Sequence, residues 1–289
     1  MRRVNIRFYS LHIRSESEIV NYVEFFEAVG GAQGSEVQVS ADYTTVLDKF
    51  EIENRIVEMV FLGGDTTAQT VYYDRSEGGA VVESSSNRRW AAKPTRVVVD
   101  LTDDNRIVAL ESIRGGVTPT LFERYLERVE VTGFPNRSVD VPPLAAESFI
   151  DEIDDFERIR LASVEVARPN IDWSDHANNL YELADESGAQ SSTAKVKAPR
   201  GESLNKHGGL IGVIREVVTS GNSSIKNATI TGRKPGDVKD RQVSLTNHHE
   251  KSSAEIDQTT SLSEQNDSLL DSLKGLAATI RSRRRDAEE

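Results

Sequence analysis

Two neighbouring histidines, His248 and His249, are followed directly by Glu250 in the run SLTNHHEK at residues 244–251. Imidazole and carboxylate side chains together can bind a metal ion or move protons. Adjacent residues of an extended chain point to opposite faces, however, so the pair is poorly placed to share one ion. Asparagine, serine and lysine are turn residues. We therefore interpret the run as a polar turn between two strands, with a metal site as the alternative.

Carboxylates form two further groups in the chain. Metal sites need carboxylates that converge from separate elements, whereas a solvated helix or linker can also carry many acidic residues in a row. The chain has no nucleophile elbow, HExxH or P-loop motif. The sequence therefore predicts no catalytic residues, no metal site and no cofactor, and a metal-dependent enzyme stays as a lesser alternative. The acidic residues concerned are Asp151, Glu152, Asp154 and Asp155, and then Asp172, Asp175, Asp185 and Glu186.

Residues 206–212, KHGGLIG, form a glycine-rich entry to an expected helix. Backbone N–H groups at such a helix start can bind phosphate. The spacing matches neither the P-loop nor the dinucleotide-binding pattern. Close approach of two elements explains the glycines equally well.

Charge is spread unevenly over the 289 residues. The chain has a net charge of −12, yet residues 1–187 carry −15 and residues 188–251 carry +6. A basic segment in an acidic chain favours a surface for a polyanion such as DNA, and the alternative is a basic domain that packs against an acidic one. Aromatic residues are scarce there, which argues against base stacking. The cations expected to contact nucleic acid are Lys195, Lys197, Arg200, Lys206, Lys226, Arg233, Lys234, Lys239 and Arg241.

Composition excludes some classes of site and compartment. The chain has no cysteine, so disulfides, zinc–thiolate sites and a cysteine nucleophile are excluded. No run approaches the roughly 18 apolar residues of a membrane span. The first residues alternate like a strand and do not resemble a signal peptide. We expect a cytoplasmic protein.

The elements that must position these residues indicate an α+β fold in two parts. Residues 1–145 are expected to form an antiparallel meander with two helices, which begin near Ser15 and at Thr118. Residues 146–289 are expected to form a mixed α/β domain with a long C-terminal helix. The first part is expected to have strands at 3–13, 43–50, 56–62, 67–73, 96–101 and 106–111, a hairpin turn at 63–65 and a loop at 76–90. The second is expected to have strands at 159–167, 193–197, 225–232, 242–247 and 254–258, and helices at 174–184, 209–219 and 263–284.

Residues 97–129, VVVDLTDDNRIVALESIRGGVTPTLFERYLERV, combine two strands, an acidic turn, a Thr-Pro-Thr segment and a helix. In this order the segment resembles phage-exclusion proteins of the RexA type and the KwaB component of the Kiwa anti-phage defence system. The resemblance implies a dimeric DNA-binding sensor that works with a separate integral membrane protein. The alternative is a protein-interaction or assembly module with no nucleic-acid role.

The last helix carries apolar residues at coiled-coil spacing with one asparagine among them. This pattern predicts a homodimer seam, and the alternative is an amphipathic helix that covers the sheet before it. Four arginines between residues 281 and 285 are expected to project beyond the seam. The seam residues are Leu262, Asn266, Leu269, Leu273, Leu276 and Ile280.

Overall fold

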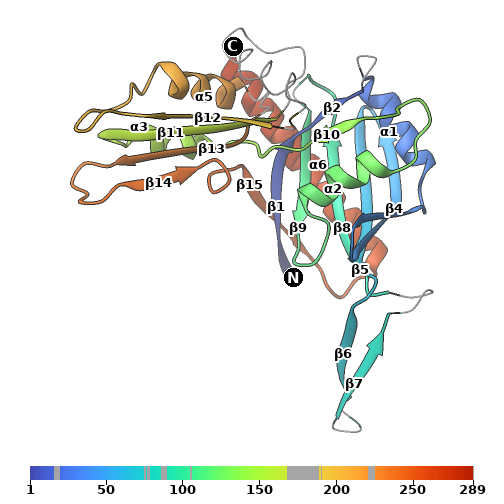
Figure 1. Ribbon diagram of the computed structural model, residues 1–289. Coiled ribbons are helices and arrows are strands. Elements are labelled where there is room, and N and C mark those ends of the chain that lie inside the picture. Colours follow the sequence, from blue (N-terminus) through green and yellow to red (C-terminus); the bar gives the residue numbers. More distant parts are fainter. Residues whose placement is uncertain are drawn as a thin grey trace.

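A computed structural model of the protein describes residues 1–15, 20–74, 76, 79–85, 90–104, 106–167, 189, 191–220 and 225–288. These residues form an α+β fold with antiparallel strands and a long C-terminal helix, as the sequence predicts. Two sheets with separate cores dominate the molecule (Figure 1). No helix among the described residues combines the length and the apolar character needed to cross a membrane.

The first sheet has seven antiparallel strands in the order β15-β1-β9-β8-β5-β4-β3. Both faces are buried, and alternation along β8 shows how: Val97 and Val99 belong to one core, whereas Val98 belongs to the other. The strands are β1 (Arg2–Ser10), β3 (Glu36–Ser40), β4 (Tyr43–Glu53), β5 (Ile56–Asp65), β8 (Lys93–Asp100), β9 (Ile107–Ser112) and β15 (Lys251–Ile256).

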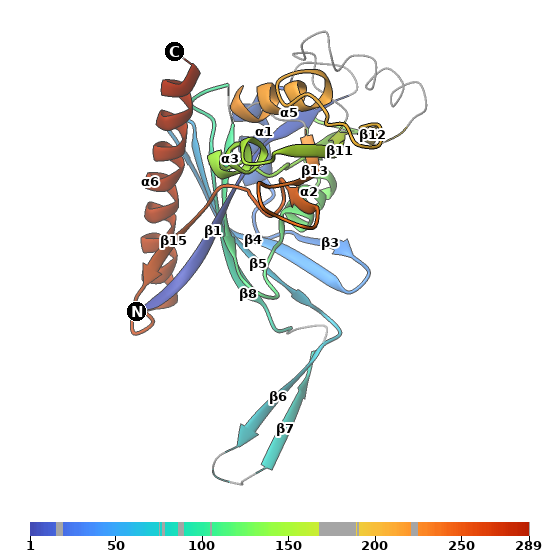
Figure 2. The ribbon, with the colours of Figure 1, turned by 90° about the vertical axis from the view of Figure 1, so that its left-hand side faces the viewer.

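Helices cover both faces of this sheet, which makes a three-layer body (Figure 2). One face packs on α1 (Tyr22–Gly31) and α2 (Pro119–Arg128), and a short ladder of β2 (His12–Arg14) with β10 (Ser138–Asp140) lies beside them. The other face packs on α6 (Leu262–Glu288).

The start of each covering helix is set by a side-chain cap. Thr118 Oγ1 accepts a hydrogen bond from the Leu121 N–H at 3.3 Å, so the predicted threonine cap of α2 is confirmed. The first helix begins later than predicted. Its cap is Asn21, whose side chain accepts from the Val23 N–H at 3.1 Å, and not Ser15. Residues 16–19, which include the Glu18 partner expected for a Ser15 cap, lie outside the described residues.

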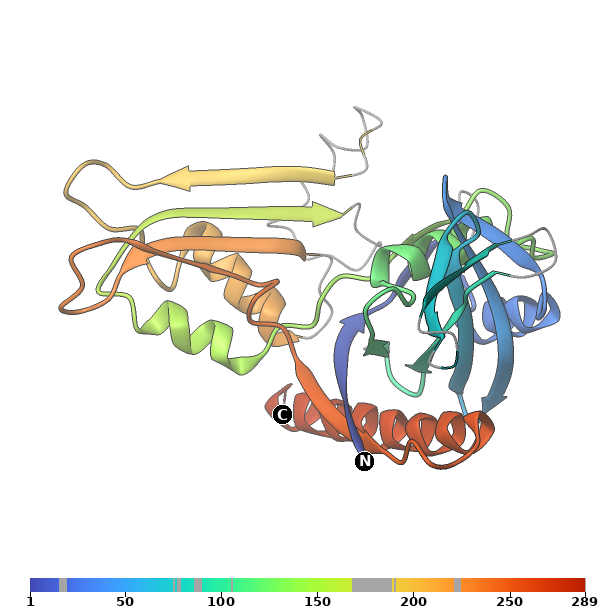
Figure 3. The same ribbon diagram turned by 90° about the horizontal axis from the view of Figure 1, so that it is seen from below.

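The second sheet has four antiparallel strands in the order β12-β11-β13-β14. Two helices pack on one of its faces through a core that includes Phe149, Ile153 and Ile214. Figure 3 looks from below at the face turned away from α5. The elements are α3 (Glu147–Asp154), β11 (Arg158–Ala167), β12 (Ser191–Lys197), α5 (Gly209–Ser220), β13 (Ile225–Arg233) and β14 (Arg241–Ser244). The helix predicted at 174–184 lies outside the described residues.

The strand pairing bears on the predicted division into residues 1–145 and 146–289. The chain does leave the first sheet near residue 145, where Ala146 N–H donates to the His248 carbonyl at 2.9 Å. It then returns, because β15 pairs with β1 and α6 covers the first sheet. The second sheet is therefore an insertion between β10 and β15. The alternation of apolar and polar residues at 254–258 predicts a strand but does not specify which strand it pairs with. The return to the first sheet could therefore not be predicted from it.

Two predicted connections of the first part are wrong. Gly63 and Gly64 continue β5 instead of turning. Glycine is required at position 64 because a Cβ there would lie 2.2 Å from the Ala91 carbonyl oxygen. The turn comes at Asp65, whose side chain accepts from the Thr67 N–H at 2.7 Å. The expected loop at 76–90 contains a strand, β7 (Gly79–Ser84), which pairs with β6 (Gln69–Asp74).

Candidate nucleic-acid interface

The second sheet carries most of the cations that the sequence assigns to nucleic acid. Lys195 and Lys197 lie on β12, the outer strand, opposite Ser163 and Leu161 of β11. Arg241 opens β14 at the other edge of the sheet. Strand pairing therefore brings together residues that are more than 40 positions apart in the sequence.

Five of the nine predicted cations are exposed and form no ion pair with any residue that the structure describes: Lys195, Lys197, Arg200, Lys239 and Arg241. Across the sheet, Lys197 lies opposite Leu161, and Leu161 lies opposite Thr231. Thr231 lies opposite Gln242, the residue that follows Arg241. Lys197 and Arg200 thus lie at the same end of the sheet as Lys239 and Arg241. Three strand spacings of about 4.8 Å put roughly 14 Å between the two groups of backbones.

The other four predicted cations are used within the chain. Lys226 pairs with Asp140 at 2.8 Å, and Arg233 lies 3.5 Å from Asp240. Lys206 donates to the Asp154 carbonyl at 3.0 Å. The prediction that these residues face a polyanion is therefore corrected, because each has a partner of its own.

Lys234 is the clearest of these corrections. Its ammonium group lies 2.9 Å from Glu152 and 2.8 Å from Asp155, and this contact lowers the pKa of Asp155. The acidic run at 150–157 is thus mostly the helix α3, which lies against the β13–β14 end of the sheet, and it is not a linker. No group of three ligands able to hold a metal ion occurs among the described residues.

A family model described as a domain of unknown function (DUF4747) matches residues 102–271. The chain belongs to this family. The matched segment covers more than half of the chain and contains the whole second sheet together with the first part of α6. No curated protein matches the sequence.

The predicted dimer seam, which lies within the DUF4747 segment and just beyond it, faces the first sheet of its own chain. Leu269, Leu273 and Ile280 are buried against the first sheet of their own chain, and Leu276 is partly buried there. Leu262 is 55% exposed. The placement of these residues between two subunits is therefore wrong. The amphipathic alternative holds, but the helix covers the first sheet and not the one before it. The homodimer itself stays a prediction.

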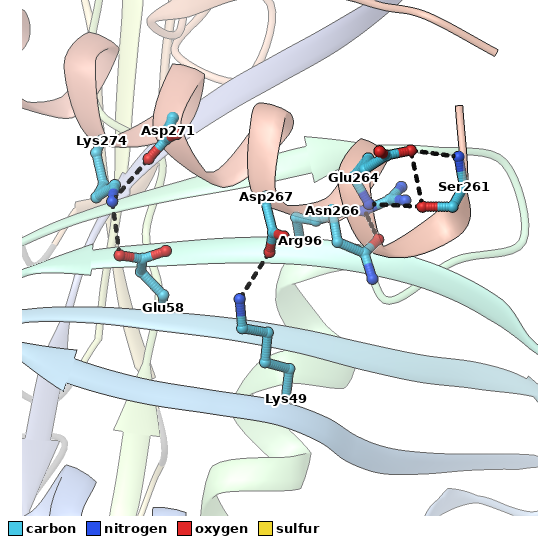
Figure 4. Close-up of polar contacts among 9 residues, drawn as sticks. All are labelled: Lys49, Glu58, Arg96, Ser261, Glu264, Asn266, Asp267, Asp271 and Lys274. Atoms are coloured by element: carbon cyan, nitrogen blue, oxygen red, sulfur yellow. Dashed lines mark hydrogen bonds and ion pairs between the residues drawn. The ribbon is translucent and has the colours of Figure 1, made fainter. Parts of the chain in front are cut away.

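The asparagine of the seam has a different role from the one predicted. Asn266 accepts a hydrogen bond from Arg96 Nε at 2.8 Å, and Arg96 forms a buried ion pair with Glu111 at 3.0 Å. Figure 4 shows Asn266 pointing from α6 to Arg96 on the sheet. Only tertiary contacts reveal that the asparagine fixes the helix on a strand of its own chain.

Further ion pairs hold α6 along the sheet. Lys49 pairs with Asp267 at 2.8 Å, and Lys274 lies 2.8 Å from both Glu58 and Asp271 (Figure 4). Arg281, expected to project freely, contacts Asp100 and Thr102 instead. Lys274 and Arg281 of α6 thus contact carboxylates of the first sheet. Arg283 lies 3.2 Å from Glu250, and Arg284 donates to the Ala145 carbonyl at 2.8 Å.

The histidine pair lies in a turn, as predicted, but one ring is buried. His249 Nδ1 is 2.7 Å from the Thr246 carbonyl, and burial lowers the pKa of the imidazole. Burial therefore favours the neutral imidazole at His249. His248 lies against Phe149, with 6.4 Å between the ring centroids.

One polar cluster escaped the sequence reasoning. Glu123 on α2 accepts a hydrogen bond from the Val141 N–H at 2.7 Å, and burial raises the pKa of its carboxyl to about 7. The neighbouring Asp140–Lys226 pair joins β10, in the short ladder beside the first sheet, to β13 of the second sheet. The only sequence signal is the pair of glutamates four residues apart, Glu123 and Glu127, which is common on exposed helices.

The glycine-rich segment does open a helix, as predicted. Gly209 has φ of +58°, a left-handed conformation that glycine adopts without strain, and it begins α5. A hollow lined by residues from His207 to Glu216 lies over this start. Its described neighbours include no cation aimed at a phosphate, so phosphate contact here stays a prediction without further support.

Proposed function

We propose that this chain is a non-enzymatic nucleic-acid-binding protein whose second sheet contacts phosphates. The observation that carries the proposal is a set of five exposed cations on that sheet, four of them at one end, which form no ion pair with any described residue although the net charge of the chain is −12. Like charges held together repel one another unless a counter-charge binds. By contrast, Lys274 on α6, Arg233 on β13 and Lys234 just after β13 are paired with carboxylates of the same chain.

The spacing of the cations fits a double helix. The group at Lys197 and Arg200 lies roughly 14 Å from the group at Lys239 and Arg241 along the hydrogen-bonding direction of the sheet. A major groove about 12 Å wide separates phosphates by a similar span. The lysine and arginine side chains are flexible enough to bridge the small difference between the spacing of the backbones and the width of the groove. Lys197 shares a face of the sheet with Gln242, so the neighbouring Arg241 points to the opposite face. We therefore infer that the two groups contact phosphates around the end of the sheet that they share.

The composition of the strands favours contacts to the nucleic-acid backbone. None of β11, β12, β13 and β14 contains an aromatic residue, so these strands offer no platform for base stacking. Phosphate contacts position a protein without reading sequence. The proposal therefore predicts binding with little sequence preference.

The test is binding of the full chain to a fluorescent duplex of about 25 base pairs at two salt concentrations. Five phosphate contacts give a salt slope of roughly −4.5, so affinity should fall on the order of several hundred-fold between 50 and 200 mM salt. Saturable binding with this loss supports the proposal. Absence of binding at about 50 mM salt overturns it.

The biological setting we propose is phage exclusion or anti-phage defence in the cytoplasm, together with an integral membrane partner. It rests on the resemblance of residues 97–129 to RexA-type and KwaB proteins, the segment that forms β8, β9 and α2. Phage plating on cells with the intact gene should fall relative to cells that lack it. Equal plating across a panel of phages would count against this setting. A gene for a small multi-span membrane protein next to this one would support the partner.

A protein-interaction module without a nucleic-acid role is the second candidate. The observation that favours it is the projecting ribbon of β6 and β7, which carries Val71 and Val82 on its surface. Substitution of Lys195 and Lys197 by glutamine separates the two candidates. If the folded variant loses both the biological effect and duplex binding, the nucleic-acid function is favoured. If it loses the biological effect but still binds the duplex, the interaction module is favoured.

A further inference from the structure

The strands β6 and β7 form a two-stranded ribbon that projects from the body of the protein (Figures 1 and 2). Within the described part of the chain, the two strands pair only with each other, from Gln69 opposite Ser84 to Asp74 opposite Gly79. A two-stranded ribbon alone is marginally stable in water. A third strand or a covering surface would stabilise it.

The surface of the ribbon suits a protein partner. Val71 is 63% exposed and Val82 is 53% exposed, and the two residues lie opposite each other in the ladder. Both outer edges of the ribbon present unpaired backbone groups, which readily accept another strand. The ribbon thus combines an apolar cross-strand pair with free hydrogen-bonding edges.

Charge points to the chemistry of the partner. Residues 69–84 contain Asp74, Glu77 and Glu83 against one cation, Arg75, so the ribbon has a net charge of −2. Potentials of opposite sign steer association and select partners. The ribbon is therefore suited to a basic strand.

A strand of this kind exists in the same chain. β12 is the outer strand of the second sheet, and no described strand pairs with its free side. Over its seven residues it carries the unpaired Lys195 and Lys197, and Val196 between them is 38% exposed. Its length matches the six-residue strands of the ribbon, about 20 Å each.

The other free edges fit less well. β14 has only four residues, and β3 carries the acidic Glu36. β15 balances Lys251 with Glu255. Among the sheet edges of the described residues, β12 is thus the one that combines length with positive charge.

The ribbon cannot reach β12 of its own chain. Figures 1 and 2 show the ribbon extending beyond one end of the first sheet, whereas the second sheet lies toward the opposite end. The occupant of β12 must then be the ribbon of another molecule.

We propose that the β6–β7 ribbon of one copy adds to the free edge of β12 of a second copy, so that this chain self-associates. Added strands bond through their backbones, and the alternate side chains give specificity. Reciprocal exchange of two ribbons closes a symmetric dimer, and one-way exchange gives a chain of copies. The proposal does not depend on nucleic-acid binding, although both involve Lys195 and Lys197.

Light scattering after size exclusion tests the proposal on the full chain at about 50 μM and without nucleic acid. Ser85 N–H donates to the Ala68 carbonyl at 3.3 Å, so a short Gly-Ser turn can replace residues 69–84 without disturbing the base of the ribbon. The parent should be a dimer or larger, and the shortened variant should be a monomer with an unchanged melting temperature.

Two charge variants locate the docking site. Lys195→Glu/Lys197→Glu should weaken association at least tenfold, and Lys239→Glu/Arg241→Glu at the other edge should leave it unchanged. A monomeric parent overturns the proposal, as does a shortened variant that associates like the parent. Association that survives Lys195→Glu/Lys197→Glu also overturns it. Failure of duplex binding would leave each of these outcomes unaffected.

Discussion

The two sheets of the molecule differ in what covers them and in how their charges are matched. The seven-stranded sheet is buried on both faces, and the cations at its α6 side are matched by Glu58, Glu111 and Asp267. Among the described residues, α3 and α5 pack on one face of the four-stranded sheet, and five cations of this sheet form no ion pair. We therefore interpret the first sheet as the structural scaffold. The second sheet presents the surface proposed to bind nucleic acid, which is the working surface of the protein.

The largest effect is expected from the buried ion pair of the scaffold. Glu111→Ala leaves the Arg96 guanidinium buried without its carboxylate, because Arg96 is 3% exposed and Glu111 is 1% exposed. Loss of one partner of a buried pair costs about 3–5 kcal/mol. Urea unfolding of the variant against the parent measures this cost.

The double variant Arg96→Met/Glu111→Leu is the control for that experiment. It removes both charges and keeps apolar volume, so it should be more stable than Glu111→Ala. It should still lie below the parent by about 1–3 kcal/mol, because Asn266 loses the Arg96 donor. A cost below about 1 kcal/mol for Glu111→Ala would mean that the α6 side of the sheet is hydrated and less scaffold-like than described.

The next effect concerns the apolar face of α6. Leu273→Ala should cost about 2–5 kcal/mol, because a fully buried leucine leaves a cavity against the sheet. Leu262→Ala, on an exposed residue of the same helix, should change stability by less than about 0.5 kcal/mol. Since the contact lies within one chain, the cost should not vary with protein concentration. A free-energy cost of Leu273→Ala that changes when the protein is diluted would show that these leucines lie at a subunit interface.

A smaller, pH-dependent effect is expected at the junction of the sheets. The pKa of Glu123 is raised to about 7 by burial, so its folded-state pKa lies above the unfolded value near 4.5. The stability from the protonated form is complete below about pH 4.5 and is lost as pH rises through 7. Over this window the parent should lose on the order of 1–3 kcal/mol relative to Glu123→Gln, which stays neutral.

Unfolding at several pH values between about 4 and 8 measures this difference. Glu130→Gln, on an exposed glutamate that follows α2 and forms no hydrogen bond with the described residues, is the matched control and should follow the parent. Parallel stability curves for the parent and Glu123→Gln would show that the Glu123 carboxyl is hydrated at this junction.

Sequence periodicity was sufficient for most elements and insufficient for their partners. The apolar run 97–99 in β8 and the Thr118 cap of α2 act over a few residues, so they could be predicted locally. The return of β15 to β1 depends on pairing across about 250 positions, as between Ile6 and Ser252. Hydrophobic spacing on α6 indicated a buried stripe but could not say whether a second subunit or the chain's own sheet covers it.

The candidate site shows the same limit. The sequence located the basic segment, but it could not distinguish Lys234, which two carboxylates of the α3 region neutralise, from Lys197, which has no such partner. The two lysines differ in tertiary surroundings and not in local pattern. Gly64 was likewise taken for a turn because the approach of the Ala91 carbonyl lies outside any local window.

The most direct measurement of the central claim compares the salt dependence of duplex binding for two matched double variants of the full chain. Lys195→Gln/Lys197→Gln removes two unpaired cations of the second sheet, and Lys49→Gln/Lys274→Gln removes two paired cations at the α6 side of the first. The first variant should flatten the plot of log affinity against log salt by roughly 1.8 units of slope, whereas the second should keep the parent slope. Equal slopes for both variants, or a larger loss from the first-sheet pair, would contradict the division between scaffold and working surface.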